Sequence, residues 1–200
     1  MPIEHGDAAP RKDERELCSR IETHLRRLEA ARRCTWRKEV QMLHWSHGGD
    51  DSRRVIRIDY ALELDGVLIG IEAKLAPTKS ADLGRHLKQC TDYSHAVFRG
   101  HAKIPREWVG KTPWAVFLAV EIGTENDWIA QHWNAARRLM GPFRVGFVAN
   151  HAYRGLCLTL CDDNIFWSER DGFRGNAQEW NKKIRAGNGA FAMPKTALPA

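Results

Sequence analysis

Residues 55–75 have the sequence VIRIDYALELDGVLIGIEAKL, and the rest of the chain is arranged around them. Two apolar runs rich in β-branched residues flank the dipeptide Asp65-Gly66. A two-residue type I′ turn requires positive φ angles, which Asp and Gly tolerate. The pattern therefore predicts a β-hairpin.

The register of this hairpin follows from the position of its loop. Counting outward from Asp65-Gly66 places Asp59 opposite Glu72 and Arg57 opposite Lys74. Side chains alternate between the two faces of a strand. One predicted face is apolar and carries Ile58, Tyr60, Leu62, Leu64, Ile69, Ile71 and Ala73. The other predicted face carries Arg57, Asp59, Glu63, Glu72 and Lys74.

Two carboxylates on neighbouring strands repel one another. An unfavourable cross-strand pair of this kind costs roughly 0.2–1 kcal/mol. A divalent cation bound by oxygen ligands is the simplest way to offset the repulsion between Asp59 and Glu72. The hairpin therefore indicates a metal site.

Length and composition favour one domain. Two hundred residues suffice for a single core. Residues 1–10 contain two prolines and a glycine, so we expect a flexible leader there. We expect a single domain over residues 11–170 and a weakly packed tail over residues 171–200, where Gly, Asn, Lys and Ala become frequent.

The balance of charge suits a polyanionic partner. The chain has 31 Lys and Arg against 25 Asp and Glu, a formal charge of +6, and a pI of about 9.2. Nucleic acid is the obvious partner for such a protein, although a merely basic soluble protein fits equally well.

Cysteine usage and hydropathy indicate a cytoplasmic protein. The five cysteines are odd in number and scattered, which favours buried thiols in a reducing compartment over a disulfide framework. Residues 1–20 are charged, and no apolar run approaches 18 residues. We therefore expect neither a secretory signal nor a membrane partner.

Hydrophobic periodicity predicts the remaining elements. The expected helices cover residues 11–33, 80–99, 124–140 and about 178–185, and the further strands cover 36–45, 114–122, 143–149, 156–160 and 165–168. The first helix has a face rich in arginine: Arg20, Arg26, Arg27, Arg32 and Arg33. This face could lie along phosphates or could simply be solvated.

The order helix, strand, strand, strand, helix, strand resembles the PD-(D/E)XK nuclease superfamily. The matching segments are Arg57-Ile58-Asp59-Tyr60, Ile71-Glu72-Ala73-Lys74 and Gln89-Cys90-Thr91-Asp92-Tyr93. The last of them resembles the Q-x-x-x-Y signature of the RecB-type and lambda-exonuclease-type branch. The resemblance covers residues 15–122, although Ile58 stands where the family has proline. It implies an α/β (α+β) fold with a restriction-endonuclease-like αβββαβ core, a central mixed sheet flanked by helices, here with a C-terminal β-rich extension.

The resemblance also implies a metal-dependent deoxyribonuclease, and the chemistry of the residues agrees. Mg²⁺ or Mn²⁺ can activate water and stabilise the charge that develops on a phosphodiester. Asp59 and Glu72 would supply ligand oxygens, and the family adds the main-chain carbonyl of Ala73. Lys74 would orient or deprotonate the water and offset phosphate charge, with an ordinary salt bridge as the alternative.

Further site residues are expected on the second helix and upstream of the hairpin. Gln89 would orient Lys74 or the scissile phosphate. Tyr93 would support the site, contact DNA or pack in the core, and Arg57 is a second candidate contact to single- or double-stranded DNA.

The family's additional metal ligand has no clear match in this chain. Glu22 is our choice because its spacing to the hairpin suits a helix packed across the site, while His24, Glu39 and His44 stay open. A charged residue on an amphipathic helix can equally be solvated.

Two other functions remain open at this level. The same fold could serve as a nucleic-acid-binding or assembly module that does not cleave, and an α/β protein unrelated to nucleic acid is a weaker alternative.

Overall fold

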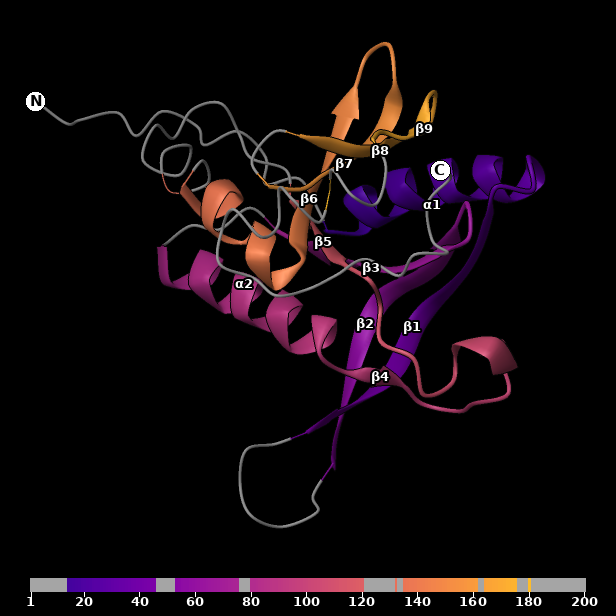
Figure 1. The fold of residues 1–200 in the computed structure, drawn as a ribbon, viewed down its shortest axis with the longest axis vertical. Helices are drawn as coiled ribbons and strands as arrows, with labels where there is room; N and C mark the ends of the chain where they lie inside the picture. The colour runs from indigo at the N-terminus through magenta and orange to yellow at the C-terminus, as the bar shows by residue number, and fades with distance from the viewer. Residues whose placement is uncertain are drawn as a thin grey trace, which may run out of the picture.

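The structure is a computed structural model that describes residues 14–45, 53–75, 80–120, 132, 135–161, 164–175 and 180. In these residues nine strands form one curled, mixed sheet in the order β4-β1-β2-β3-β5-β6-β7-β8-β9 (Figure 1). Strands β3, β5 and β6 are parallel neighbours, and the other neighbouring pairs are antiparallel. The predicted α+β class is confirmed.

The elements follow one another in the predicted order over the first 120 residues. The helices are α1 Glu14–Ala30 and α2 Ser80–Ser94, with short 3-10 turns η1 Arg106–Trp108 and η2 Gly141–Phe143. The strands are β1 Cys34–Trp45, β2 Arg53–Leu64, β3 Val67–Lys74, β4 Val97–Phe98, β5 Val116–Val120, β6 Val145–His151, β7 Gly155–Thr159, β8 Ile165–Ser168 and β9 Gly172–Phe173.

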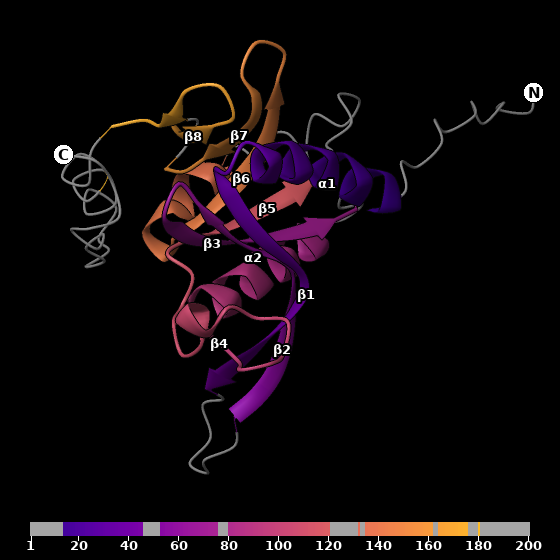
Figure 2. The ribbon, with the colours of Figure 1, turned by 90° about the vertical axis from the view of Figure 1, so that its right-hand side faces the viewer.

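The two long helices cover opposite faces of the sheet (Figure 2). Helix α1 places Ile21, Leu25 and Leu28 in one core cluster, at the spacing of a single helical stripe. Helix α2 contributes Leu83 and Cys90 to a second cluster on the other face. The hairpin face that we predicted to be polar is therefore covered by α2, and the central strands are buried on both sides.

The predicted hairpin register is confirmed from the loop to the pair Tyr60–Ile71. Asp65 and Gly66 have φ angles of 45° and 85°, the positive values that a type I′ turn requires. Asp65 can adopt this conformation because its short polar side chain tolerates the left-handed region.

Several element boundaries differ from the sequence prediction. Helix α2 ends at Ser94, and the chain then adds β4 to the outer edge of β1, where we predicted helix to residue 99. The predicted strand over residues 114–122 is β5, which pairs in parallel with β3 and β6. Residues 135–139 are helical as predicted, whereas most of the predicted helix over 124–140, the leader and the loop over 46–52 lie outside the described residues.

The C-terminal strands belong to the same core as the hairpin. Trp180 is only 1% exposed and packs edge-on against Phe166 of β8. Strand β9 extends the sheet beyond residue 170, where we placed the end of the domain. Within the predicted tail, β9 thus joins the sheet and Trp180 is buried, while residues 181–200 lie outside the described residues.

Arg33 joins three distant segments of the chain. Its guanidinium donates to both carboxylate oxygens of Asp65 at 3.2 and 2.8 Å and to the carbonyl of Glu169 at 2.6 Å, and it lies 5.4 Å from the ring centre of Trp167. The indole of Trp167 donates to Asp65 at 2.9 Å. The hairpin loop, the turn after α1 and strand β8 are thereby held together.

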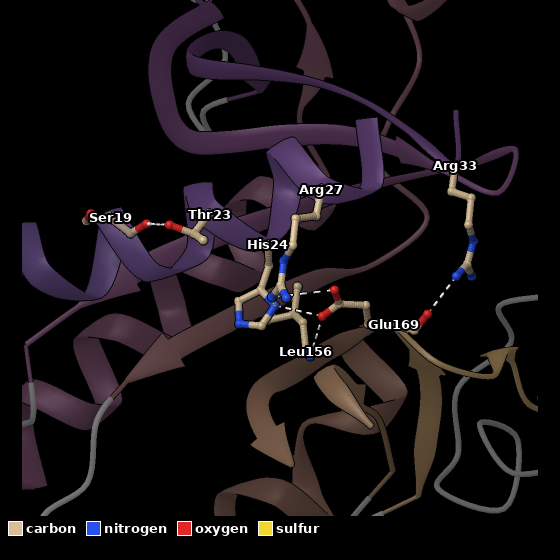
Figure 3. Close-up of polar contacts among 7 residues, drawn as sticks. All are labelled: Ser19, Thr23, His24, Arg27, Arg33, Leu156 and Glu169. Carbon is tan, nitrogen blue, oxygen red and sulfur yellow. Dashed lines mark hydrogen bonds and ion pairs between the residues drawn. The ribbon is translucent and has the colours of Figure 1, made fainter. Parts of the chain in front are cut away.

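The Glu169 carboxylate forms a second link between α1 and the C-terminal strands, as Figure 3 shows. It accepts a hydrogen bond from the backbone N–H of Leu156 at 3.1 Å and lies 2.7 Å from His24 Nδ1 and 3.5 Å from Arg27. Burial opposes its ionisation, but the bonds from Leu156 and His24 outweigh burial and lower the pKa of Glu169. The C-terminal third is thus fixed to the first helix.

None of the helices in the described residues is long and apolar enough to span a membrane.

We predict that Asp65→Asn destabilises the protein by about 1–2 kcal/mol at pH 7, because the bonds from Arg33 and Trp167 lose their charged acceptor. Burial opposes ionisation of Asp65, yet these bonds outweigh it and lower its pKa below 3.8. The contribution is therefore present at neutral pH and is lost as the pH falls below 3.8. Urea denaturation of both proteins at pH 7 and pH 3 measures the difference.

The matched control is Asp92→Asn, which removes an exposed pair with Lys88 within α2. This variant should change the free energy of unfolding by less than about 0.5 kcal/mol. Equal effects of the two substitutions at pH 7 would contradict the role of Asp65.

Candidate active site

At Asp59 the pairing of β2 with β1 is interrupted for one residue, and its pairing with β3 ends. The β1–β2 ladder pairs Lys38 with Tyr60 and Val40 with Ile58 but contains no pair between Glu39 and Asp59. Glu39 has a φ of 53°, which marks a local distortion of β1. The β2–β3 ladder, counted from the hairpin loop, ends at the pair Tyr60–Ile71 and does not include Asp59. The predicted carboxylate therefore lies where the sheet opens.

The opening also rotates the strand, so one predicted face assignment is wrong. We expected Ile58 to share the face of Tyr60, but Ile58 lies in the core cluster on the α2 side and Tyr60 in the cluster on the α1 side. A Cβ added to Gly70 would lie 2.4 Å from Ile58 Cδ1. The absence of a side chain at Gly70 therefore leaves space for the Ile58 side chain on the α2 face of the sheet.

Side chains replace the missing ladder bonds between β2 and β3. The backbone N–H of Asp59 donates to Glu72 Oε2 at 3.3 Å, and the N–H of Ala73 donates to Asp59 Oδ2 at 2.8 Å. Each carboxylate is thus fixed by the backbone of the opposite strand. Asp59 and Glu72 are close neighbours, as the register predicted.

The main-chain carbonyl of Ala73 faces the same opening. In a strand, the N–H and C=O of one residue point towards the same neighbouring strand. Because the N–H of Ala73 points to Asp59, its carbonyl points towards the space that β2 has left. Two carboxylates and one carbonyl therefore converge, and oxygen ligands of this kind suit Mg²⁺ or Mn²⁺.

Glu72 is a buried carboxylate that is repelled by the charge of Asp59. Its side chain is 1% exposed, and burial followed by the charge of Asp59 raises its pKa from 4.5 to about 7. Lys74 Nζ lies 2.5 Å from Glu72 Oε1. Burial would lower the pKa of Lys74, but the bond to Glu72 and the charges of Asp59 and Glu14 outweigh burial and raise it. Lys74 is thus an ammonium group that is bound to the Glu72 carboxylate.

Gln89 and Tyr93 fix the backbone of β2 next to this opening. The Gln89 amide donates to the Tyr93 hydroxyl at 2.7 Å, and that hydroxyl donates to the carbonyl of Arg57. Tyr93 is 2% exposed. Its placement favours the supporting role over contact with DNA, because a buried ring with an occupied hydroxyl offers no surface to a nucleic acid.

The other α2 residue near the lysine is His86. It is almost fully buried, and its Nδ1 makes no hydrogen bond within the described part of the chain. Burial, followed by the charge of Lys74, lowers its pKa. A neutral imidazole therefore lies next to the Lys74 ammonium.

The structure does not bring Glu22 to the strand carboxylates. Glu22 binds Lys38 Nζ at 2.8 Å and the Tyr60 hydroxyl at 3.2 Å, on the α1 side of the sheet. The bond from Lys38 is the main reason that its pKa is lowered. A satisfied surface ion pair explains this residue, so our choice of Glu22 as a ligand lacks support.

The open alternatives to Glu22 have other partners as well. His24 binds Glu169, Glu39 lies 3.9 Å from Arg57, and the charge of His44 acts on His95. Glu14, at the start of α1, is the helix carboxylate whose charge acts on Lys74. The sequence contains a signal for it: Glu14 lies seven residues before Ile21 and continues the buried stripe by two turns.

Within the described residues, no group of three or more His, Cys, Asp and Glu side chains is placed to hold a metal ion. The candidate site has two carboxylates and a main-chain carbonyl, and Glu14 stands nearby. This set can bind a cation whose remaining positions are filled by water or a phosphate oxygen, which is common for Mg²⁺.

We predict that Asp59→Asn stabilises the metal-free protein at pH 8 by on the order of 1 kcal/mol, because it removes the charge that acts on buried Glu72. The raised pKa of Glu72 means that its favourable contribution is complete below pH 4.5 and is lost as the pH rises through about 7. The gain should therefore shrink at pH 5, where Glu72 is protonated. Urea denaturation in EDTA at both pH values measures it.

A difference of the same size and sign at pH 5 and pH 8 would show that Asp59 does not act on Glu72. Asp92→Asn serves again as the control, since Asp92 pairs with Lys88 on the surface.

Comparison with protein-family models, with curated proteins and with solved structures found no match. The chemistry assigned to this chain therefore depends on the arrangement of Asp59, Glu72, Ala73 and Lys74.

Proposed function

We propose that the protein is a metal-dependent nuclease that hydrolyses phosphodiester bonds of DNA. The observation that carries this proposal is the pair Asp59–Glu72 with Lys74 at the opening of the sheet. A buried carboxylate whose pKa is raised by burial and by a second carboxylate destabilises the fold. Such a cost is typical of a functional site, where a bound cation compensates for it.

The arrangement of the elements supports a restriction-endonuclease-like core. A helix precedes three antiparallel strands, and a second helix leads to a strand that pairs in parallel with the third. The helices lie on opposite faces of the sheet. Apart from the short strand β4 between α2 and β5, this order is compatible with the αβββαβ core that the resemblance implies, and β6 to β9 would be the added C-terminal part.

Asp59, Glu72 and the carbonyl of Ala73 would hold Mg²⁺ or Mn²⁺. The ion would supply an activated water and stabilise charge on the phosphoryl oxygens. Asp59 is fixed by the N–H of Ala73, so little reorganisation is needed to present its other oxygen. Glu72 Oε2 accepts the N–H of Asp59 and Oε1 lies against Lys74, so an ion at Oε1 would take the place of that ammonium group.

Lys74 would be the charge partner of the phosphate, because its raised pKa keeps it an ammonium group, and it could act as a general base only after giving up that proton. It lies two residues from Glu72 on the same face of β3, and its ammonium is held against that carboxylate. Gln89 and Tyr93 would act as positioning residues, because they fix the Arg57 carbonyl two residues before Asp59.

The overall charge and the cysteines support the rest of this proposal. The formal charge of +6 suits DNA as the partner. All five cysteines are free thiols, which fits a reducing, cytoplasmic location.

We predict that the purified protein cleaves DNA in Mg²⁺ or Mn²⁺ and not in EDTA. Lys74→Ala should lower the rate at least about 100-fold, the contribution of a positioned acid–base group. Circular and linear substrates, single- and double-stranded, are compared on one gel, which also separates endonuclease from exonuclease activity.

The control is Lys88→Ala, which removes an exposed lysine of α2 and should leave cleavage unchanged. Circular dichroism verifies that both variants are folded. Cleavage by Lys74→Ala at the wild-type rate would refute the role of Lys74. Metal-independent DNA binding without cleavage of any substrate would instead identify a non-cleaving binding module.

A second prediction separates the two helix carboxylates. Glu14→Gln should lower metal-dependent cleavage about 10–100-fold, as expected for a residue that supports a metal site. Glu22→Gln should leave the rate unchanged, because Glu22 pairs with Lys38 and Tyr60 instead. Metal titration of the rate measures both effects, and the opposite ranking would restore Glu22 as the ligand.

A further inference from the structure

Beyond Asp59, strands β1 and β2 continue as a ribbon that extends past the rest of the sheet (Figure 1). Among the strands that the structure describes, only the two-residue β4 joins the base of this ribbon, through the pairs Met42–Phe98 and Leu43–Val97. One side of this ribbon is buried: Met42 and Phe98 belong to the core cluster on the α2 side. The alternate residues must therefore face outward.

We name this outward side the arm face and define it by Gln41, Leu43, Val55, Arg57, Val97 and Arg99. The register places them in two rows: Val55, Leu43 and Val97 lie side by side, and Arg57 and Gln41 lie beside Arg99, which follows β4 and whose N–H donates to the Gln41 carbonyl at 3.1 Å. Arg57 and Arg99 flank the central strand, and the Arg99 guanidinium donates to the Gln41 side chain at 3.3 Å. The position of Arg99 is thus fixed by the strand beside it.

The arm face is open to solvent and basic. Val55 is 45% exposed and the Arg57 side chain 61% exposed. The one acidic group recorded beside these arginines in the described residues is Glu39, 3.9 Å from Arg57. At that distance and exposure the pair is weak, so Arg57 can exchange it for a phosphate.

The arm face adjoins the candidate active site. Arg57 precedes Asp59 by two residues, or roughly 7 Å along an extended strand. Its carbonyl is fixed by Tyr93, so this part of β2 keeps its position relative to α2. Arg57 and Asp59 are therefore near one another along β2, while the Arg57 side chain lies on the face opposite the α2 cluster that contains Ile56 and Ile58.

We propose that the arm face binds the backbone of double-stranded DNA beside the scissile bond, with Arg57 and Arg99 on phosphates across one groove. This inference rests on the proposed nuclease function and names its substrate class. The two arginines lie two strand spacings apart, about 10 Å. Long side chains at this spacing match the grooves of B-DNA, about 6 and 12 Å wide.

The side chains described on the arm face favour a duplex over a single strand. Proteins that bind single strands stack bases on aromatic rings. The described apolar side chains here are aliphatic: Leu43, Val55 and Val97. A flat aliphatic surface between two cations suits a regular phosphate backbone, and none of the six residues that define the arm face is aromatic.

The experiment measures binding without cleavage. Fluorescence anisotropy in EDTA compares a 20-base-pair duplex, a probe length of about two helical turns, with one of its single strands, using full-length Asp59→Asn protein. Introducing both Arg57→Gln and Arg99→Gln into this Asp59→Asn background should weaken duplex binding at least about tenfold. The slope of the logarithm of the binding constant against the logarithm of salt concentration should fall in magnitude by about two. Single-strand binding should change less than threefold.

Two further variants serve as controls. Arg170→Gln removes an equally exposed arginine in the turn before β9 and should leave duplex affinity unchanged. Glu39→Gln removes the acidic neighbour of Arg57 and should tighten duplex binding several-fold, a gain that misfolding cannot produce.

The outcomes keep the two proposals apart. Wild-type duplex affinity in the double variant, or an equal loss for single strands, would overturn the arm face as a duplex site while Lys74-dependent cleavage could still stand. Arm-dependent duplex binding by a protein that cleaves nothing would keep the arm face and refute the nuclease.

Discussion

The exchange of hydrogen bonds between Asp59 and β3 is the constraint on which the candidate site depends. An antiparallel ladder normally satisfies each backbone group with another backbone group. Here the ladder stops at Tyr60–Ile71, and the carboxylates of Asp59 and Glu72 accept the N–H groups that the ladder leaves. The sheet can therefore open without leaving these donors unsatisfied, and both carboxylates are fixed at the opening.

The opening also explains why both faces of the sheet contribute to one site. On the α2 side, Ile58 crosses over Gly70, and Tyr93 binds the Arg57 carbonyl. On the α1 side, the first helix brings Glu14 close enough to act on Lys74. The resulting burial raises the pKa of Glu72. The ionised form of Glu72 therefore lowers the stability of the fold, and a cost of this kind is common at functional sites.

The C-terminal third has a structural role that is separate from this chemistry. Arg33 binds Asp65 in the hairpin loop and Glu169 beyond β8, while the Glu169 side chain meets α1. The hairpin is thus fixed at its loop by the C-terminal strands, and it opens at the other end. Strand β2 is thus fixed at the hairpin loop, and beyond its pairing with β3 it continues as a ribbon with β1.

The local chemistry of the sequence was enough to predict the hairpin, its register, the two long helices and the proximity of Asp59, Glu72 and Lys74. These features depend on turn preference and on periods of two and 3.6 residues, which act over short distances. The boundaries of α2 and the partners of Arg33 were not predictable, because they depend on residues more than 30 positions away.

The site shows the same division. Counting from Asp65-Gly66 placed the hairpin residues correctly as far as the pair Tyr60–Ile71, since register is a local property. The rotation at Asp59, the burial of Tyr93 and the pairing of Glu22 with Lys38 were decided only by the tertiary structure. Each depends on how a helix lies against the sheet, and a helix with charged residues two turns apart can present either one to a site. The sequence by itself determined which groups could act together, and the packing of α1 and α2 determined which of them meet.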